Sequence, residues 1–381
     1  MENAKVDFIR RFEQCVSRMC VTDTVALLHD TDPDGVTSGV IVAKAIERLR
    51  ARPIDYVIRQ HHGEAGITKD TIDFVKENKV QVLITVDKAI DQDPESLKEC
   101  LKRCEVIVFD HHRYTKDLNE ARCLFIKPPM FSDIEMSRYP TARMVYDLFF
   151  PLVDIRDTDW LMAVGTIADA AYKQWKFAID GVFDRHQIPK VDDIYESELA
   201  KVAHIITSTI IVSPKDIPKL FETVYAAADY KEVLASPLGK HQKIFEAELD
   251  HWLNKAQSKA ELYIEQKLIV YYITPKYNVK SVLSTLLSVK KYVGWTVVVA
   301  EEENGADFIS LSIRNQASTV DCVDLIRDSL KDLDGASGGG HIPAVGGRVK
   351  KKDYAIFHDR LLRRFGIPDA AYQAQLKRIS G

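Results

Sequence analysis

Three aspartates at alternating positions, Asp30, Asp32 and Asp34, follow a short apolar segment and precede a stretch whose apolar spacing predicts a helix. A buried strand that ends in clustered acids and turns into a helix places those acids at the carboxyl edge of a sheet, where open α/β folds bind their ligands. Carboxylates this close repel one another unless a cation neutralises them, so the pattern predicts a divalent metal site. Asp34 alone could equally cap the helix, but one helix end needs one or two caps.

Acidic and imidazole groups also follow two further predicted strands. Asp87 ends one apolar segment, and Asp110, His111 and His112 end the next. A single aspartate after a strand is more often a turn residue. Three such strand ends lie along one edge of a parallel sheet, so we expect these side chains to converge on the same metal site.

A fourth candidate is Asp169, which lies among small and apolar residues where an unpaired carboxylate is costly. Gly165, one helical turn earlier, leaves room for another group to approach. The alternatives for Asp169 are a helix cap and a salt bridge in the core.

The elements that must position these groups alternate along the first part of the chain. Predicted strands cover residues 25–28, 54–58, 80–86 and 106–109, and predicted helices cover 36–50, 68–78 and 94–103. The strands are apolar throughout and the connections are short. This pattern predicts an α/β fold with a mainly parallel sheet and helices on both faces.

The pattern changes after the middle of the chain. Residues 180–260 are charged and amphipathic, which indicates helices, and three β-rich segments follow, 268–273, 295–300 and 308–313, before a helix at 320–333. We therefore expect a catalytic domain over 1–185, a helical connector over 186–262 and a smaller α/β substrate-binding domain over 263–381.

Three successive glycines, Gly338, Gly339 and Gly340, precede His341 within this last part. Such a run lets a backbone approach a ligand closely and aim N–H groups at an anion. His341, together with Arg314 at the end of a predicted strand, could add charged donors to a phosphate. A flexible linker is the alternative, but the run lies between two structured elements.

Composition excludes several classes of protein. The 381 residues are 46% apolar, carry a net charge of −4 and contain no run of 18 apolar residues and no hydrophobic signal segment. We therefore expect a cytoplasmic protein with no membrane partner and reduced thiols. The six cysteines lack a metal-binding spacing, and the helical spacing of Cys100 and Cys104 predicts packing.

These motifs, in this order, resemble the DHH phosphoesterase superfamily and, within it, the archaeal-type RecJ-like branch with a C-terminal DHHA1 domain. The stretches that carry the resemblance are Asp30-Thr-Asp-Pro-Asp-Gly35, Val86-Asp87, Asp110-His-His112, Gly165-Thr-Ile-Ala-Asp169 and Gly338-Gly-Gly-His341. The first motif begins with Asp, which is more similar to RecJ nucleases than to small-molecule relatives. The chain shows no obvious nucleic-acid-binding OB domain, a difference from bacterial RecJ, so the resemblance does not determine substrate length or cleavage polarity.

The resemblance implies two metal ions, Mn²⁺ or else Mg²⁺, and a mixed Asp/His ligand set suits these ions better than Zn²⁺. The implied metal ligands are Asp30, Asp32, Asp34, Asp87, His111 and Asp169. Asp87 would bridge the two ions, His112 would contact the scissile phosphate and Asp110 would orient a histidine. Arg314 and the loop from Gly338 to His341 would hold the phosphate of a nucleotide.

The resemblance further implies two-metal hydrolysis of phosphodiesters by a single-strand-specific exonuclease, in a cleft between the domains, on DNA or RNA. Two alternatives remain open. One is an enzyme for small substrates, namely a nanoRNase, an adenosine-bisphosphate phosphatase or a cyclic-dinucleotide phosphodiesterase. The other is a replication scaffold, which the complete ligand set argues against. A helicase or a replication or repair protein is the expected partner class, and the sequence does not determine the oligomeric state.

Overall fold

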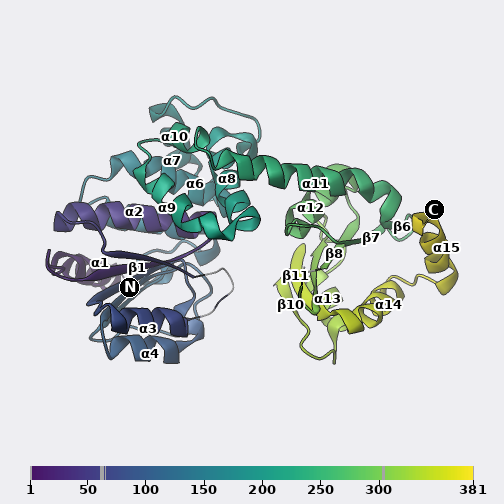
Figure 1. Ribbon diagram of the computed structural model, residues 1–381, viewed down its shortest axis with the longest axis horizontal. Coiled ribbons are helices and arrows are strands. Elements are labelled where there is room, and N and C mark those ends of the chain that lie inside the picture. Colours follow the sequence, from purple (N-terminus) through teal and green to yellow (C-terminus); the bar gives the residue numbers. More distant parts are fainter. Residues whose placement is uncertain (1, 61–63, 65, 303–304, 381) are drawn as a thin grey trace. The chain divides into compact units, whose positions relative to one another are not determined.

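The computed structural model describes residues 2–60, 64, 66–302 and 305–380. The chain forms two compact units, Met1–Gln242 and Lys243–Gly381 (Figure 1). Each unit contains its own sheet and its own hydrophobic core. The α/β fold class expected from the sequence, with a parallel-sheet unit and a smaller second unit, is confirmed.

The sheet of the first unit is entirely parallel. Its strands are β1 (Val25–Asp30), β2 (Tyr56–Gln60), β3 (Val82–Val86), β4 (Glu105–Phe109) and β5 (Cys123–Ile126). They lie in the order β2-β1-β3-β4-β5, so the order reverses between β1 and β3. In open parallel sheets a ligand binds outside the carboxyl ends of the strands at this switch point. The short strand β5 has no counterpart among the predicted strands.

Helices cover both faces of this sheet because alternate strand residues are apolar on both sides. Val25 and Leu27 face a core shared with α1 (Glu2–Ser17), α2 (Pro33–Arg50), α5 (Thr141–Phe149) and α6 (Asp159–Ala168). Ala26 and Leu28 face a second core with α3 (Lys69–Glu77) and α4 (Pro94–Leu101), on the other side of the sheet (Figure 1). Cys100 and Cys104 lie buried in this second core, which confirms that they pack.

Further helices complete the first unit. They are α7 (Tyr172–Arg185), α8 (Glu198–Val212), α9 (Ile217–Ala226) and α10 (Tyr230–Leu234), and α11 (Gly239–Lys259) follows. Leu199 and Ile206 of α8 and Leu220 of α9 belong to the same core as α2 and α6. Residues 198–234, which the sequence assigned to a connector, therefore pack within the first unit.

The second unit contains a mixed six-stranded sheet in the order β10-β11-β9-β8-β7-β6. Its strands are β6 (Glu261–Tyr263), β7 (Leu268–Ile273), β8 (Thr296–Glu302), β9 (Phe308–Arg314), β10 (Ser337–His341) and β11 (Ala344–Lys350). Within the described residues of this second sheet, only the β7–β8 pair is parallel. The helices are α12 (Lys280–Leu286), which continues as a π-helix (Leu287–Lys291), α13 (Cys322–Leu330), α14 (Tyr354–Arg364) and α15 (Asp369–Ser380). Across the described residues of both units, every helix is too short or too polar to span a bilayer.

Candidate metal centre

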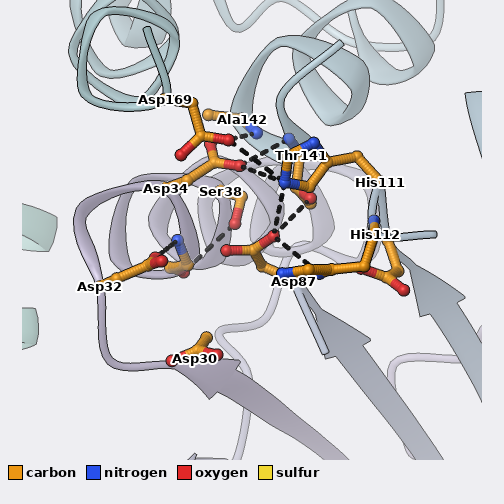
Figure 2. Close-up of polar contacts among 12 residues, drawn as sticks. Asp30, Asp32, Asp34, Ser38, Asp87, His111, His112, Thr141, Ala142 and Asp169 are labelled. Carbon is orange, nitrogen blue, oxygen red and sulfur yellow. Dashed lines mark hydrogen bonds and ion pairs between the residues drawn. The ribbon is translucent and has the colours of Figure 1, made fainter. Parts of the chain in front are cut away.

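Five side chains from four segments meet at the carboxyl edge of the first sheet, beside the switch point between β1 and β3 (Figure 2). They are Asp34 on α2, Asp87 after β3, His111 and His112 after β4, and Asp169 after α6. The convergence of strand ends expected from the sequence is present in the structure.

His111 lies at the middle of this group. Its Nε2 is 3.2 Å from Oδ2 of Asp169, 3.5 Å from Oδ1 of Asp87 and 3.9 Å from Oδ2 of Asp34. Asp34, His111 and Asp169 form one set of possible metal ligands, and Asp87, His111 and His112 form a second. Within each set the ligand atoms lie within 4.8 Å of one another. Two adjacent sets that share one imidazole are compatible with a centre for more than one ion.

The two imidazoles are oriented by groups behind them. Nδ1 of His111 lies 3.3 Å from the carbonyl oxygen of Met136, which leaves Nε2 toward the carboxylates. Nδ1 of His112 lies 2.7 Å from Oδ1 of Asp110, and the N–H of His112 donates to the same oxygen at 3.1 Å. A partner on the second ring nitrogen is the usual way in which proteins fix the tautomer and direction of a metal-binding histidine. Asp110 therefore orients the ring of His112, and the catalytic role of this pair stays a prediction.

The first residues of α5 hold the two buried carboxylates in place. The N–H groups of Thr141 and Ala142 donate to Oδ2 and Oδ1 of Asp34 at 2.7 and 2.9 Å. The hydroxyl of Thr141 donates to Oδ1 of Asp87 at 2.9 Å (Figure 2). Free N–H groups and the positive end of the helix dipole make a helix start a natural anion partner. Sequence reasoning missed both residues, and the only local signal is the helix start after Pro140.

Gly165 explains how Asp34 reaches this position. A Cβ atom added at Gly165 would lie 2.7 Å from Oδ1 of Asp34 and 2.6 Å from Cβ of Ala142. Such distances are far inside van der Waals contact, so a side chain at this point of α6 would displace Asp34. The group for which Gly165 leaves room is therefore the Asp34 carboxylate.

The electrostatics of the centre favour a bound cation. Burial, followed by the charges of Asp169 and Asp32, raises the pKa of Asp34 well above its usual value. Burial and then the charge of Asp34 raise the pKa of Asp87 in the same way. Burial also lowers the pKa of His111 to about 4, so its imidazole is neutral near pH 7. Buried carboxylates with a neutral imidazole and no thiolate match the ligand preferences of Mn²⁺ and Mg²⁺.

The structure separates two of the predicted ligands from this group. Asp30 ends β1, where Nζ of Lys88 lies 3.3 Å from its Oδ2 and the N–H of Thr31 donates to its Oδ1 at 2.5 Å. Its side chain lies apart from the cluster in Figure 2 and belongs to neither ligand set. The expectation that Asp30 joins the centre is therefore not supported. Alternate residues share one face only in an extended chain, and the chain leaves the extended conformation between Asp30 and Asp34, where α2 begins.

Asp32 also belongs to neither ligand set. It is the N-cap of α2, and its Oδ1 accepts the N–H of Gly35 at 2.8 Å. The capping role considered for Asp34 thus belongs to Asp32, while Asp34 lies in the first helical turn. The charge of Asp32 still contributes to the raised pKa values of Asp34 and Asp87. Its role as a metal ligand stays a prediction.

A buried lysine lies behind the Asp110-His111-His112 segment. The side chain of Lys127 is fully buried, and its Nζ lies 2.6 Å from Oδ2 of Asp110, 3.2 Å from Oδ1 of Asp91 and 2.7 Å from the carbonyl oxygen of His112. Burial opposes the ionisation of Asp110, but the bond with His112 and the charge of Lys127 hold the pKa of Asp110 below its usual range. Although burial acts against its charge, the bond to Asp110 raises the pKa of His112. No motif in the sequence marks Lys127.

In the second unit, Arg314 ends β9 and is half-buried. Its guanidinium donates to the carbonyl oxygens of Ile313 and Val345 at 3.2 and 3.3 Å and to the hydroxyl of Thr285 at 3.5 Å. No carboxylate of the described residues forms an ion pair with it, and burial lowers the pKa of Arg314. A half-buried guanidinium with only neutral partners retains its charge for an anionic ligand.

The glycine run forms an edge strand, β10, rather than a loop. Gly338 and Gly340 are explained by packing. A Cβ at Gly338 would lie 2.7 Å from Cδ1 of Ile326, and one at Gly340, whose φ is +146°, would lie 2.5 Å from the carbonyl oxygen of Ala344. Gly339 faces open space, and His341 is exposed. An edge strand presents unpaired backbone groups, so the run can still offer N–H donors to a ligand.

Residues 24–166 match the DHH family, N-terminal domain. No curated protein sequence matches the chain. A RecJ from Thermus thermophilus in complex with Mn²⁺ has a TM-score of 0.66 and 18% identity over 94% of this chain, which spans only 55% of that protein.

Two further solved structures span nearly the same length as this chain. An exonuclease RecJ bound to manganese has a TM-score of 0.66 and 20% identity, and the match covers 97% of each chain. An exopolyphosphatase-related protein from Bacteroides fragilis has a TM-score of 0.53 and 15% identity over 94% of this chain and 97% of that one. At these identities the likeness shows a shared RecJ-like fold.

Proposed function

We propose that this protein is a metal-dependent phosphodiesterase, because residues 24–166 match the N-terminal domain of the DHH family and the chain has a RecJ-like fold. We propose further that it is a single-strand-specific exonuclease of the RecJ type that acts on DNA or RNA. The observation that carries the proposal is the pair of ligand sets that meet at His111, between buried Asp34 and Asp87.

The residues of the centre fit a pair of Mn²⁺ ions, with Mg²⁺ as the alternative. Asp34, Asp87, His111 and Asp169 would hold them, and Oδ1 of Asp87, which lies within 4 Å of both His111 and His112, supports the inclusion of Asp87. When bound, the two ions would lower the pKa of a water molecule and neutralise charge on the phosphoryl oxygens.

We assign His112 to the substrate, although it also belongs to the second set of possible metal ligands. Its Nδ1 bonds to Asp110, its side chain is 35% exposed, and the bond to Asp110 raises its pKa. A protonated imidazole can donate a hydrogen bond from Nε2 to a phosphate oxygen as negative charge develops there. Lys127 supports this role because it keeps Asp110 ionised.

We also propose that Arg314, Gly338, Gly339, Gly340 and His341 of the second unit bind the phosphate groups of a nucleotide. The charge of Arg314 and the exposed edge of β10 support this role. Arg314→Ala should raise KM for an oligonucleotide about tenfold or more while kcat changes less. Arg327→Ala, which removes an exposed guanidinium paired with Asp324, should leave both constants unchanged. A fall in kcat with an unchanged KM would contradict the assignment.

The test of the activity itself is cleavage of end-labelled single-stranded DNA and RNA with Mn²⁺. His111→Ala and Asp87→Asn should each reduce the rate at least a hundredfold. The matched control is Asp229→Asn, because Asp229 caps α10 and an asparagine can keep that cap. Wild-type rates in the first two variants would refute the hydrolase proposal.

The likeness to an exopolyphosphatase-related protein favours a second candidate, an enzyme for small phosphorylated substrates. The same centre would serve both functions, so substrate length distinguishes them. An exonuclease should cleave a 20-mer at least as fast as a 2-mer, whereas a small-substrate enzyme should act on the 2-mer alone.

A further inference from the structure

A polar hollow of the first unit lies at the edge of the sheet where the strands begin, opposite the edge that carries the metal centre. It is bounded by the end of α1 and by residues at the starts of the strands, among them Asp23 before β1, Glu105 at the start of β4 and Arg122 before β5. Its volume is about 380 Å³, which is in the range of small-ligand sites. The length of the strands places it roughly 15–20 Å from the metal centre.

Four arginines gather at this hollow. Arg18, Arg103 and Arg122 line it, and Arg11 lines a small adjoining cavity that Arg18 and Arg122 share. No carboxylate in the described ranges of the chain forms an ion pair with any of the four. The two acids of the hollow, Asp23 and Glu105, leave two of the four positive charges unbalanced, in a chain whose net charge is −4.

Three of these guanidinium groups are fixed in place by backbone carbonyls. Arg122 donates to the carbonyl oxygen of Leu101 at 2.7 Å, Arg18 donates to that of Gln14 at 3.2 Å, and Arg11 donates to two carbonyls at 2.9 and 3.1 Å. Neutral carbonyls hold a guanidinium without cancelling its charge. The arginines are therefore pre-positioned for an anion, and less side-chain entropy is lost when one binds.

We propose that this hollow binds a phosphate group, carried by a nucleotide or by a nucleic-acid strand, at a site separate from the metal centre. Guanidinium groups recognise phosphate through paired, charge-assisted hydrogen bonds. A phosphate monoester carries close to two negative charges at neutral pH, and two neighbouring phosphodiesters of a strand carry the same charge, so either source matches the unbalanced charge of the hollow. No metal ligand contributes to this site, so the inference does not depend on the proposed activity.

An exposed cysteine beside the arginines allows ligand binding to be measured by chemical modification. Cys20 lines the hollow and is exposed, whereas the other five cysteines are buried or half-buried. The experiment measures the alkylation rate of Cys20 by iodoacetamide, mapped by mass spectrometry, in EDTA and at constant ionic strength. The probes are inorganic phosphate, dAMP and a 12-nucleotide single-stranded DNA with the same total phosphate concentration.

The three probes and two variants give the following expected results. At least one probe should slow the alkylation of Cys20 threefold or more in the wild-type protein. Arg103→Glu should abolish this protection, because it replaces one of the four positive charges with a negative one. Arg103 is exposed and has no side-chain hydrogen bond among the described residues, so it suits this test. Lys201→Glu, the same charge change at an exposed position of α8, should retain it. Stronger protection by dAMP would identify a free nucleotide as the ligand, and stronger protection by the oligonucleotide would identify a strand.

The proposal is overturned by either of two outcomes. One is the absence of protection by all three probes in the wild-type protein. The other is equal protection in the wild-type protein and in Arg103→Glu, which would show that the arginines do not form the site. Because the assay contains EDTA, neither outcome depends on cleavage, and a failure here is distinguishable from a failure of the hydrolase proposal.

Discussion

Nε2 of His111 lies 3.2 Å from Oδ2 of Asp169, although the first residue follows β4 and the second follows α6. The same imidazole nitrogen lies within 4 Å of Asp34 and Asp87. Three carboxylates around one neutral imidazole are a costly arrangement without a cation, because buried like charges repel. The geometry therefore matches the one proposed for a metal centre, and the energetics of this arrangement can be tested.

Mn²⁺ should stabilise the folded protein. An ion at one hundred times its dissociation constant adds about 2.7 kcal/mol to the free energy of unfolding, which corresponds to a few degrees in Tm. Thermal unfolding with EDTA or with Mn²⁺ measures this shift. His111→Ala should lose most of it, while Asp229→Asn should keep it. An equal shift in His111→Ala would show that Mn²⁺ binds elsewhere.

The stability of the metal-free protein should depend on pH in a particular direction. The pKa values of Asp34 and Asp87 are raised above the usual 3.8. A carboxyl group with a raised pKa holds its proton more tightly in the folded state. The protonated carboxyl groups of Asp34 and Asp87 therefore add to the free energy of unfolding at low pH. This contribution is lost as the pH rises from about 3.8 through the raised pKa values.

Asp87→Asn isolates this effect, because asparagine cannot ionise and tolerates the positive φ of +59° at this position. In EDTA the variant should lose less unfolding free energy than the wild-type protein between about pH 4 and pH 8, as chemical denaturation would show. Mn²⁺ should remove the loss from the wild-type protein alone. Parallel pH profiles in EDTA would contradict the raised pKa of Asp87.

Gly165→Ala should disturb the metal centre through one methyl group. The new Cβ would lie 2.6 Å from the hydroxyl of Thr37 and from Cβ of Ala142, and 2.7 Å from Oδ1 of Asp34. We expect a loss of about 1–3 kcal/mol in unfolding free energy and weaker Mn²⁺ binding. Gly181→Ala is the matched control, because the nearest atom to its new Cβ is 3.5 Å away on α7.

In Gly181→Ala the higher helix propensity of alanine should raise the free energy of unfolding by up to about 1 kcal/mol. Urea denaturation and calorimetric titration with Mn²⁺ check both variants. If Gly165→Ala gained stability as Gly181→Ala does, the close approach of Asp34 to α6 would be wrong.

Lys127→Met should be strongly destabilising. It leaves the buried carboxylates of Asp91 and Asp110 without their cation, a change that costs about 3–5 kcal/mol when one partner of a buried pair is removed. Lys98→Met breaks only an exposed pair with Glu95 and should change stability by less than about 1 kcal/mol. Equal denaturation midpoints for the two variants would show that the buried network does not hold the Asp110–His112 segment.

The sequence was sufficient for those features that local pattern determines. Apolar strands followed by acids predicted a parallel sheet and the convergence of Asp34, Asp87 and His111, because parallel strands end at one edge. Asp169 follows the helix α6, and only the family resemblance implied that it joins them. The position of Asp30 outside both ligand sets was not predictable in this way. Alternation keeps side chains on one face only while the chain stays extended, and the backbone leaves that conformation at the start of α2.

Other features depend on packing between distant segments. Lys127 and Thr141 carry no local motif, and they reach the centre only because β5 and α5 lie beside β4 and α2. The glycines from 338 to 340 predicted a ligand loop, but contacts with Ile326 and Ala344 require two of them in a hairpin. The arginines of the opposite hollow are dispersed along the chain, so only the fold brings them together.

The most direct test of the metal centre is anomalous diffraction at the manganese edge from crystals grown with Mn²⁺. We predict two peaks about 3.5–4 Å apart, within ligand distance of Asp34, Asp87, His111 and Asp169. A map without an anomalous peak among these four side chains, in crystals that hold Mn²⁺ elsewhere, would contradict the account.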